Sequence, residues 1–332
     1  MIKLKYMFEN YELAKLALKN WKHDEEQLIS YLKYFRISSN AVYPFPANGK
    51  LHFLRLSPKT EKQVQNLKGE LEFLQYLKSC GYPALTPVAS KTGNMLLELE
   101  SQWGTYYASV FKGVPGKAVE DTDYHSKVMT AYGKALGRLH RLAMEYEPGC
   151  RKWSYKEVLT WIKDVFETYH APEIMRYECI CVERELDLLK CNRENFGLVH
   201  YDFEPDNVFF DEAEGCCYAI DFEDGMYHFY LVDILRVFEA LSEELGDTEL
   251  FHAKRYFLMG YQSEKSLEKD YEEKLPLMSR FCNLYSYAGL IRSIAEEVPQ
   301  EPLWMKHMRH KLEMKISDLE RKVKLQTMDE IR

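Results

Sequence analysis

Apolar residues follow two different periods along the chain, and these periods divide it into two parts. In the first part, strand-like runs at 41–45 and 51–56 flank Asn48-Gly49, a dipeptide typical of tight hairpins because both of its positions accept positive φ. A capping box over 60–63 predicts the start of a helix, apolar positions from 64 to 77 continue it, and Gly81 ends it. Two more strand-like runs lie at 95–99 and 106–111, and an opening helix is expected at 11–21.

Helical spacing dominates the second part, which follows Gly113-Val-Pro-Gly116. We expect helices at 128–146, 155–169, 174–190, 230–245, 251–261, 275–297 and 304–323. One β-hairpin interrupts them, with runs at 208–210 and 217–220 around the turn residues 211–215. The pattern predicts an α+β fold with two lobes, a small antiparallel-sheet lobe over residues 1–112 and a mostly helical lobe over residues 113–332.

Charge is unevenly distributed between these two parts. The whole chain has 44 basic and 52 acidic residues, a net charge of −8, which makes a general nucleic-acid binder a weak interpretation. Residues 1–112 carry a net charge of +5, and the remainder carries −13. The basic part suits an anion such as a nucleotide, whereas the acidic part suits metal ions or a cationic substrate; solvated helix faces explain part of the excess.

Cysteine spacing and hydropathy limit the cellular setting. The eight cysteines form no C-x-x-C motif and no zinc-finger spacing with histidine. The first 18 residues, which carry five charged side chains, do not resemble a signal peptide, and no apolar run is long enough to span a membrane. We therefore expect free thiols, a cytoplasmic protein and no membrane partner.

The segment with the most chemical information is Gly197-Leu-Val-His-Tyr-Asp-Phe-Glu-Pro-Asp-Asn-Val-Phe-Phe210, which gives an H-x-D-x-x-x-x-N spacing. Asp202 and Asn207 lie on a loop that enters the first strand of the expected hairpin, and Asp221 follows the second strand. The hairpin should bring these three oxygen-bearing side chains together. Asn207 and Asp221 offer hard oxygen ligands of the kind that Mg²⁺ prefers, which leaves Asp202 to accept a proton from an alcohol.

This segment resembles the catalytic loop and the metal-binding aspartate of the protein-kinase-like superfamily, and most closely its aminoglycoside phosphotransferase / choline kinase branch. Asp221-Phe-Glu-Asp-Gly225 and the later Asp233 are similar to that branch's metal motif and downstream helix aspartate. The resemblance extends from about residue 38 to about residue 290. It implies a bilobal protein-kinase-like fold and an ATP- and Mg²⁺-dependent phosphotransferase, with GTP as an alternative nucleotide.

The resemblance also implies roles for individual residues. Asp202 would be the catalytic base and His200 would brace its loop, while Asn207 and Asp221 would hold Mg²⁺. The remaining nucleotide-binding positions are an ion pair of Arg55 with Glu70, a loop over the phosphates at Ser39 and Asn40, and an adenine-binding hinge at Phe111, Lys112 and Gly113. Arg55 stands where a lysine is usual, and a guanidinium can still clamp phosphate. A surface ion pair is the rival interpretation of Arg55 and Glu70.

Two other residues are better explained by structure than by catalysis. His140 lies on an apolar helical stripe and is expected to be a packing histidine with its polar atoms satisfied. Asp233 is expected to be a helix N-cap that also supports the catalytic loop by hydrogen bonds.

The acceptor is expected to be a small molecule with a hydroxyl group, polar or cationic in character. The carboxylates that could hold an amine are Glu204, Glu223, Asp224, Glu239, Glu243 and Glu244. Glu204 occupies the position where protein kinases carry a lysine, which favours a small-molecule kinase over the alternative of an atypical protein Ser/Thr kinase. A nucleotide-binding pseudokinase scaffold is a third hypothesis. The sequence leaves the acceptor's identity and the oligomeric state open.

Overall fold

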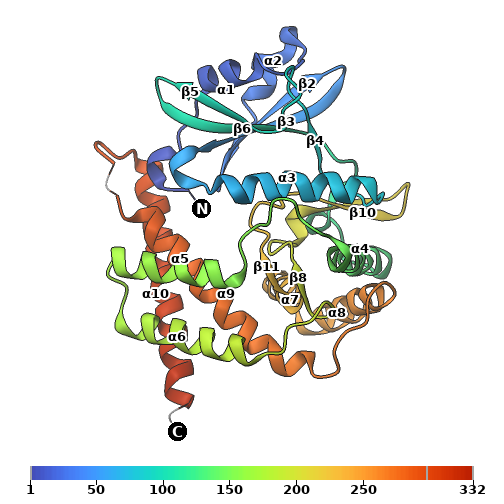
Figure 1. Ribbon diagram of the computed structural model, residues 1–332, viewed down its shortest axis with the longest axis vertical. Coiled ribbons are helices and arrows are strands. Elements are labelled where there is room, and N and C mark those ends of the chain that lie inside the picture. The colour runs from blue at the N-terminus through green and yellow to red at the C-terminus, as the bar shows by residue number, and fades with distance from the viewer. Residues whose placement is uncertain (1, 297, 331–332) are drawn as a thin grey trace.

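The computed structural model describes residues 2–296 and 298–330, and it has two lobes stacked one above the other (Figure 1). The upper lobe is built on a six-stranded antiparallel sheet with the order β1-β2-β3-β6-β4 and with β5 paired to β6. Its strands are β1 (Arg36–Ile37), β2 (Ala41–Ala47), β3 (Lys50–Pro58), β4 (Thr86–Val88), β5 (Leu97–Ser101) and β6 (Gly104–Lys112). The expected small antiparallel-sheet lobe is therefore confirmed.

The hairpin between β2 and β3 forms at the predicted dipeptide. Ala47 pairs with Lys50, and the two residues between them have φ values of 52° at Asn48 and 67° at Gly49. Both values lie in the left-handed region, which asparagine and glycine tolerate best. This turn sets the register that places Arg55 opposite Val42 on one side and Ser109 on the other.

Two short helices cover one face of the sheet. These are α1 (Tyr11–Leu18), which ends three residues earlier than expected, and α2 (Glu25–Leu32), which the sequence pattern did not reveal. Their apolar side chains pack with those of the strands in one cluster that includes Trp21, Phe45 and Leu54. Burial of this face leaves the opposite face of the sheet to look toward the second lobe.

Helix α3 (Val64–Ser79) runs between the two lobes (Figure 1). The predicted capping box at its start is wrong: a short 3-10 helix, η2 (Lys59–Glu61), comes first, and the residues Lys62 and Gln63 are extended before α3 begins. Lys62 instead reaches across to Glu223, so a contact in the tertiary structure overrides the local capping signal. The inner stripe of α3 packs into the core of the lower lobe.

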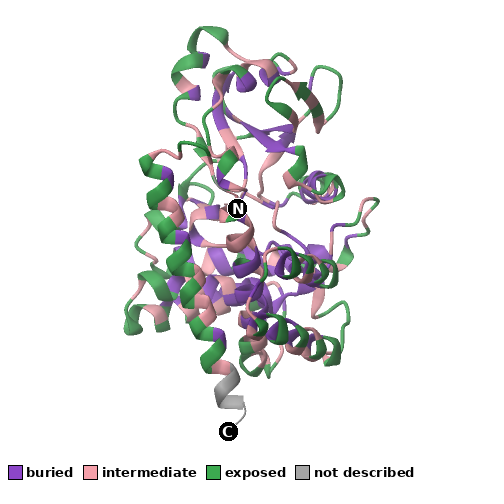
Figure 2. Cartoon of the chain, turned by 90° about the vertical axis from the view of Figure 1, so that its left-hand side faces the viewer, coloured by how far each residue is buried: buried purple, intermediate pink, exposed green. Residues whose placement is uncertain are grey.

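The lower lobe is mostly helical, as expected, and its core is the larger of the two. Its helices are α4 (Ser126–Glu145), α5 (Tyr155–Thr168), α6 (Glu173–Leu188), α7 (Leu231–Glu244), α8 (Asp247–Gln262), α9 (Tyr271–Ile294) and α10 (Leu303–Glu330). Figure 2 shows buried residues through the centre of this lobe, whereas the long helix that leads to the C-terminus is mainly exposed. No helix among the described residues has the length and apolarity needed to cross a bilayer.

Helices α4 and α8 lie unusually close together because glycine occupies both sides of their contact. A Cβ atom on Gly133 would lie 1.8 Å from the carbonyl oxygen of Phe257, and one on Gly260 would lie 2.0 Å from that of Thr130. Neither position has room for a side chain. The close contact fixes α4, which carries His140, against the rest of the lobe.

Small β elements interrupt the helices where the site is built. The predicted hairpin is confirmed as β9 (Val208–Asp211) and β10 (Cys216–Ala219), and β7 (Lys117–Ala118) adds a third strand. A separate pair, β8 (Phe196–Leu198) with β11 (Tyr227–Phe229), was not predicted. Strand β8 enters the segment 199–226 and β11 leaves it, so the pairing of these two strands anchors both ends of the segment that contains the β9–β10 hairpin.

The N-terminal segment joins the two lobes a second time, away from the 113–116 connection. The 3-10 helix η1 (Leu4–Tyr6) places Leu4 in a small buried cluster with Met305 and Leu312 of α10. In the upper lobe, the backbone N–H of Ile2 donates to the carbonyl of Ser38 at 3.2 Å. This strap, residues 2–6, therefore contacts both lobes.

Candidate active site

The β9–β10 hairpin brings the catalytic-loop candidates beside the residue that follows the second strand. Val208 pairs with Ala219, and the N–H of Ile220 donates to the carbonyl of Asn207 at 2.9 Å. Asp221 comes next and has φ 60°, a left-handed conformation that turns the chain away from the hairpin. Asn207 and Asp221 are thus held at the same end of the hairpin.

Asp202 and Asn207 are directly bonded. The Nδ2 group of Asn207 donates to the Asp202 backbone carbonyl at 3.1 Å and to its carboxylate Oδ2 at 2.9 Å. Because the amide nitrogen is used in this way, the Asn207 Oδ1 atom is the one left for another ligand. The backbone between these two residues is compact, because Pro205–Asn207 form the one-turn 3-10 helix η4.

A buried carboxylate holds the start of this loop. Asp233, in the first turn of α7, accepts backbone N–H groups from His200 at 2.9 Å and Tyr201 at 2.6 Å. It also lies 2.9 Å from Nε2 of His140, whose Nδ1 is 3.0 Å from the hydroxyl of Tyr261. The supporting role expected for Asp233 is seen, but the N-cap assignment is wrong because Tyr230 occupies that position.

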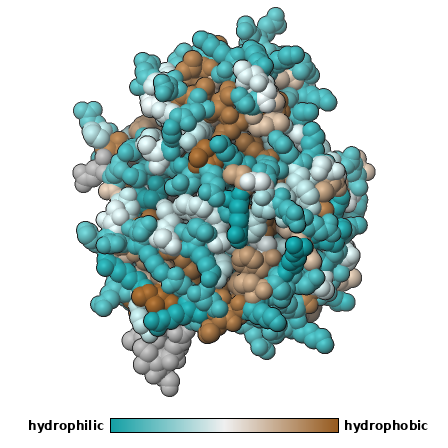
Figure 3. Space-filling model, in the orientation of Figure 1, coloured by the Kyte–Doolittle hydropathy of each residue, from teal (hydrophilic) through white to brown (hydrophobic). Residues whose placement is uncertain are grey.

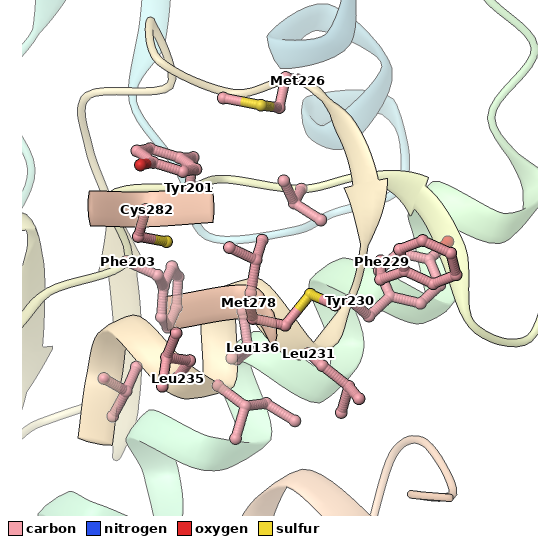
Figure 4. Close-up of a cluster of buried hydrophobic side chains, with 14 of the residues drawn as sticks. Leu136, Tyr201, Phe203, Met226, Phe229, Tyr230, Leu231, Leu235, Met278 and Cys282 are labelled. Carbon is pink, nitrogen blue, oxygen red and sulfur yellow. The ribbon is translucent and has the colours of Figure 1, made fainter. Parts of the chain in front are cut away.

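His200 ties the loop to the hairpin. Its Nε2 lies 2.8 Å from the carbonyl of Ile220 and therefore donates to it. Burial lowers the pKa of His200 to about 4, so the ring is neutral near pH 7. Figure 4 shows the neighbouring Tyr201 and Phe203 within the buried cluster beside Cys282 of α9. The start of the catalytic loop therefore packs against the buried core of the lower lobe.

In the upper lobe, Arg55 and Glu70 form a buried bidentate ion pair. The two guanidinium–carboxylate distances are 2.8 and 2.6 Å, and the side chains are 6% and 0% exposed, which excludes the surface-pair interpretation. Arg55 also donates to Ser109 at 3.3 Å and lies over the ring of Phe111. These contacts fix the orientation of the guanidinium between β3 and α3.

Glu223 joins this upper-lobe cluster. Its carboxylate lies 3.5 Å from Arg55, forms an ion pair with Lys62 and accepts a hydrogen bond from Asn40. The side-chain amide oxygen of Asn40 in turn accepts from Ser57 at 2.6 Å. Burial opposes ionisation of Glu223, but Lys62 and Arg55 outweigh it and lower its pKa to about 2. Glu223 is therefore grouped with the cations of the upper lobe.

The two aspartates have the opposite electrostatic surroundings. Burial raises the pKa of Asp221 to about 7, and the nearby carboxylate of Glu223 adds to the effect. Burial also raises the pKa of Asp202 well above its usual range, with further contributions from Glu204 and Asp224. Both carboxylates would be stabilised in the ionised form by a cation placed between them.

A cleft of about 1030 Å³ opens beside Asp202. Of the expected acceptor residues, Glu204, Glu223, Asp224, Glu239 and Glu243 line it. Glu244 does not: its carboxylate accepts a hydrogen bond from the hydroxyl of Tyr124. Ser39, expected over the phosphates, also lines the cleft, but Phe111, Lys112 and Gly113 do not.

The expected adenine hinge has one peptide group already in use. The N–H of Gly113 donates to the carbonyl of Leu51 at 2.9 Å, which extends the pairing of β3 with β6. It is therefore not free to bind a base in this conformation. Lys112 ends β6, opposite His52.

The sequence patterns did not predict three basic residues of the site. Lys62 pairs with Glu223, and the buried Lys152 donates to the carbonyls of Phe222 at 2.9 Å and Glu223 at 2.6 Å. Arg236 of α7 pairs with Glu204. Only Arg236 had a usable signal, because it lies one helical turn after Asp233 and so faces the same loop.

The donor set suits a hard divalent cation. Asn207 offers an amide oxygen, and Asp221 offers a carboxylate whose pKa is raised by burial. Neither the amide oxygen nor the carboxylate forms a hydrogen bond or an ion pair with the described residues. No cluster of three or more His, Cys, Asp or Glu side chains with metal-binding geometry occurs in the part of the chain that is described. A cation here would therefore take its remaining ligands from water or phosphate, as Mg²⁺ commonly does.

Comparison with known proteins agrees with this geometry. A model of the phosphotransferase enzyme family matches residues 38–267. Amicoumacin kinase of Bacillus subtilis (strain 168) is 22% identical over 305 residues, which cover 88% of this chain and 87% of that protein. Homoserine kinase of Caulobacter vibrioides (strain NA1000 / CB15N) is 26% identical over 224 residues, 66% of this chain and 68% of that protein.

Solved structures share the fold. Amicoumacin kinase hAmiN in complex with AMP-PNP, Ca²⁺ and Ami superposes with a TM-score of 0.75 at 21% identity, covering 95% of each chain. The microcompartment-associated aminopropanol kinase gives 0.66 at 17% identity, covering 95% of this chain and 98% of that one. The bilobal protein-kinase-like fold expected from the sequence is thereby confirmed. Because the family model spans more than half of the sequence, the chain belongs to the phosphotransferase enzyme family.

Proposed function

We propose that this enzyme transfers the γ-phosphoryl group of ATP, with Mg²⁺, to a hydroxyl group of a small polar molecule that carries an amine. The observation that supports it most is the grouping of Asp202, Asn207 and Asp221 at one end of the β9–β10 hairpin, where Asp202 also lines the cleft. The relatives named as kinases of amicoumacin, homoserine and aminopropanol also favour a small-molecule acceptor.

Some of these residues act on the acceptor hydroxyl, and others bind the phosphates of the nucleotide. Asp202 accepts the proton of the acceptor hydroxyl as the hydroxyl oxygen bonds to the γ-phosphorus and the bond from that phosphorus to ADP breaks, and Asn207 holds the Asp202 carboxylate in position. Asn207 and Asp221 would hold the Mg²⁺ of bound Mg-ATP, which would supply the phosphoryl group and neutralise its charge. Arg55, oriented by Glu70, contributes a fixed positive charge for the phosphates. Positioning accounts for most of the rate, since the transition state of phosphoryl transfer is loose.

The acceptor's amine is assigned to the acidic wall of the cleft. Glu239 and Glu243 come from α7, and Glu204 comes from the catalytic loop. A cationic group bound there would lie beside Asp202, because Arg236 bridges Glu204 and Asp202. The eight cysteines are all free thiols, which supports a reducing cytoplasm as the setting.

The test is a Mg-ATP consumption screen over amino alcohols, sugars and aminoglycosides, followed by kinetics of variants on the best acceptor. Asp202→Ala should lower kcat by roughly a hundredfold or more with little change in nucleotide affinity. Asp206→Ala is the matched control, because Asp206 lies on the same loop and its carboxylate lies 3.8 Å from Arg36, on the upper lobe. Turnover of Asp202→Ala close to that of the unmodified enzyme would refute the assignment.

A further inference from the structure

The far wall of the cleft, beyond the acidic side chains, carries hydrogen-bond donors from α9 and α10. Asn283 of α9 is 9% exposed, and Lys315 and Lys322 of α10 line the same cleft. The two lysines are seven residues apart, which places them on one face of α10, two turns from each other. Asp318 lies between them but accepts a hydrogen bond from Arg321 at 2.8 Å. The wall therefore keeps an excess of positive charge.

The amide of Asn283 has a definite orientation. The ammonium group of Lys322 lies 3.2 Å from one of its terminal atoms, and because an ammonium can only donate, that atom is the oxygen Oδ1. The Nδ2 group is then fixed on the other side. It is buried and has no hydrogen-bond partner among the described residues.

A buried amide N–H₂ group without a partner is unusual, because leaving it unsatisfied costs roughly 1–3 kcal/mol. Asn283 lines the cleft although its Nδ2 atom is itself covered, so a ligand in the cleft can satisfy this group once the amide turns toward it. Only an acceptor atom can do so, and the neighbouring ammonium of Lys322 favours one with negative charge or a strong dipole. A carboxylate or carbonyl oxygen meets both conditions.

The acidic wall is one helical turn away. Glu239 accepts a hydrogen bond from Ser279 at 2.8 Å, and Ser279 precedes Asn283 by four residues on α9. Four residues of an α-helix advance about 6 Å. Arg236 lies 3.9 Å from Glu239 and 3.7 Å from Asp202, so Asp202, Glu239 and Asn283 follow one another along the cleft.

We propose that Asn283 and Lys322 form a subsite for an acyl oxygen, so that the acceptor is an amino alcohol that also carries a carboxylate or an amide carbonyl. This inference rests on the proposed phosphotransfer to a hydroxyl group. Its chemistry follows from the order of groups in the cleft: a base for the hydroxyl, carboxylates for the amine, and donors for the acyl oxygen.

The experiment uses matched acceptors that differ only at the acyl group. L-Homoserine, its primary amide and 2-amino-1,4-butanediol share the amine and the reacting hydroxyl, but the diol replaces the acyl carbon with a hydroxymethyl group. Longer amino alcohols with the same three end groups extend the panel. Binding is measured by calorimetry with AMP-PNP and Mg²⁺ present, and phosphoryl transfer is measured with Mg-ATP. We expect the acyl members to bind at least tenfold more tightly than their diol partners.

Variants then assign the discrimination to the subsite. Asn283→Asp replaces the free donor with a carboxylate oxygen, and Lys322→Met removes the ammonium; each should raise Kd for acyl members at least tenfold and leave Kd for the diols within twofold. Lys324→Met is the control, since Lys324 is also exposed on α10 but does not line the cleft. Asn283→Ser serves in place of Asn283→Asp if that variant does not fold.

The outcomes separate this inference from the proposed function. Transfer to amino alcohols without any preference for the acyl members would overturn the subsite while leaving the phosphotransferase proposal intact. Binding of acyl members that depends on Asn283, without transfer to any hydroxyl, would support the subsite and count against the proposed function. Failure of every acyl member to bind would overturn the inference.

Discussion

One guanidinium nitrogen of Arg236 lies 3.7 Å from the carboxylate of Asp202 and is also paired with Glu204. Two carboxylates two positions apart on the catalytic loop thus share a cation from α7, and Glu239 lies 3.9 Å from the same guanidinium. Burial alone would oppose so many charges in one place. Arg236 therefore balances the acceptor side of the site, as Arg55 and Lys62 balance Glu223 on the other side.

Removal of Arg236 should destabilise the protein through the carboxylates it leaves behind. We expect Arg236→Gln to lower the free energy of unfolding by about 3 kcal/mol, because Glu204 and Glu239 lose their cation in a partly buried site. Glu204→Gln in the same chain should recover about 1 kcal/mol. Urea unfolding of the two single variants and the double variant measures this coupling. Additive effects would mean that the pair is not energetically linked.

Asn207 and Asp221 should control the response to magnesium. Asn207→Ala and Asp221→Ala each remove one oxygen ligand from the proposed ion site, so the Mg²⁺ concentration for half-maximal rate should rise about tenfold or more. Initial rates against MgCl₂ at fixed ATP provide the measurement. Asp211→Ala, on the same hairpin but hydrogen-bonded to the backbone of Ala213, is the control. An unchanged Mg²⁺ dependence in both variants would remove these residues from the ion site.

The Arg55–Glu70 pair should be sensitive to the loss of one partner. Glu70→Gln leaves a buried guanidinium without its bidentate partner, and we expect it to lower the free energy of unfolding by about 3 kcal/mol. Glu98→Gln breaks the exposed pair with Lys59 and should change it by about 0.5 kcal/mol or less. Urea unfolding compares the two. Equal effects would show that burial does not distinguish the pairs.

Buried histidines should make the fold acid-sensitive. Burial lowers the pKa of His200 and His228 to about 4. Between pH 6.5 and 4 the unfolded chain binds a proton at each ring that the folded chain does not, so stability falls as the pH is lowered through this window. Each ring contributes at most about 3 kcal/mol.

His228→Asn isolates one of these contributions. Asparagine keeps an acceptor for the N–H of Phe229, which His228 Nδ1 accepts at 2.8 Å, but it does not titrate. Thermal unfolding from pH 7 to pH 4 should therefore show a shallower fall in Tm for the variant than for the unmodified protein. Parallel curves would mean that His228 does not take up a proton on unfolding.

Local signals made much of the fold predictable. The Asn48-Gly49 turn depends only on the φ preferences of its own residues, and the loop from His200 to Asn207 depends on spacing within a few residues. Signals of this kind involve only residues that are close together in the chain, so they can be identified from the sequence alone. Short elements such as α2 and β4 were missed because their apolar residues are too few to establish a period.

Contacts across long separations were not predictable in the same way. Lys62 and Glu223 are 161 residues apart, and their pairing depends on how the two lobes meet. The outcome for Glu244 depends on which face α7 turns toward the cleft, because Glu243 lines the cleft whereas Glu244 bonds to Tyr124. Composition predicted the net negative charge of the lower lobe, but it could not predict which of its carboxylates face the cleft.

The surface gives little sign of this internal organisation. Figure 3 shows a mainly hydrophilic face, with apolar atoms gathered over the sheet-bearing lobe. The polar groups that matter for chemistry are inside the cleft or beneath it, where Asp233 is fully buried. The hydropathy of this face is therefore a poor guide to the site.

The strap over residues 2–6 has a mechanical consequence. Lys3 and Lys5 pair with Glu296 of the lower lobe, and the backbone N–H of Lys3 donates to Glu61 of the upper lobe at 3.3 Å. The lobes are thus linked at this strap as well as at the 113–116 connection. A swing of the lobes about the 113–116 connection would have to break these strap contacts. Opening is therefore resisted at the rim near Ile2, which lines the cleft.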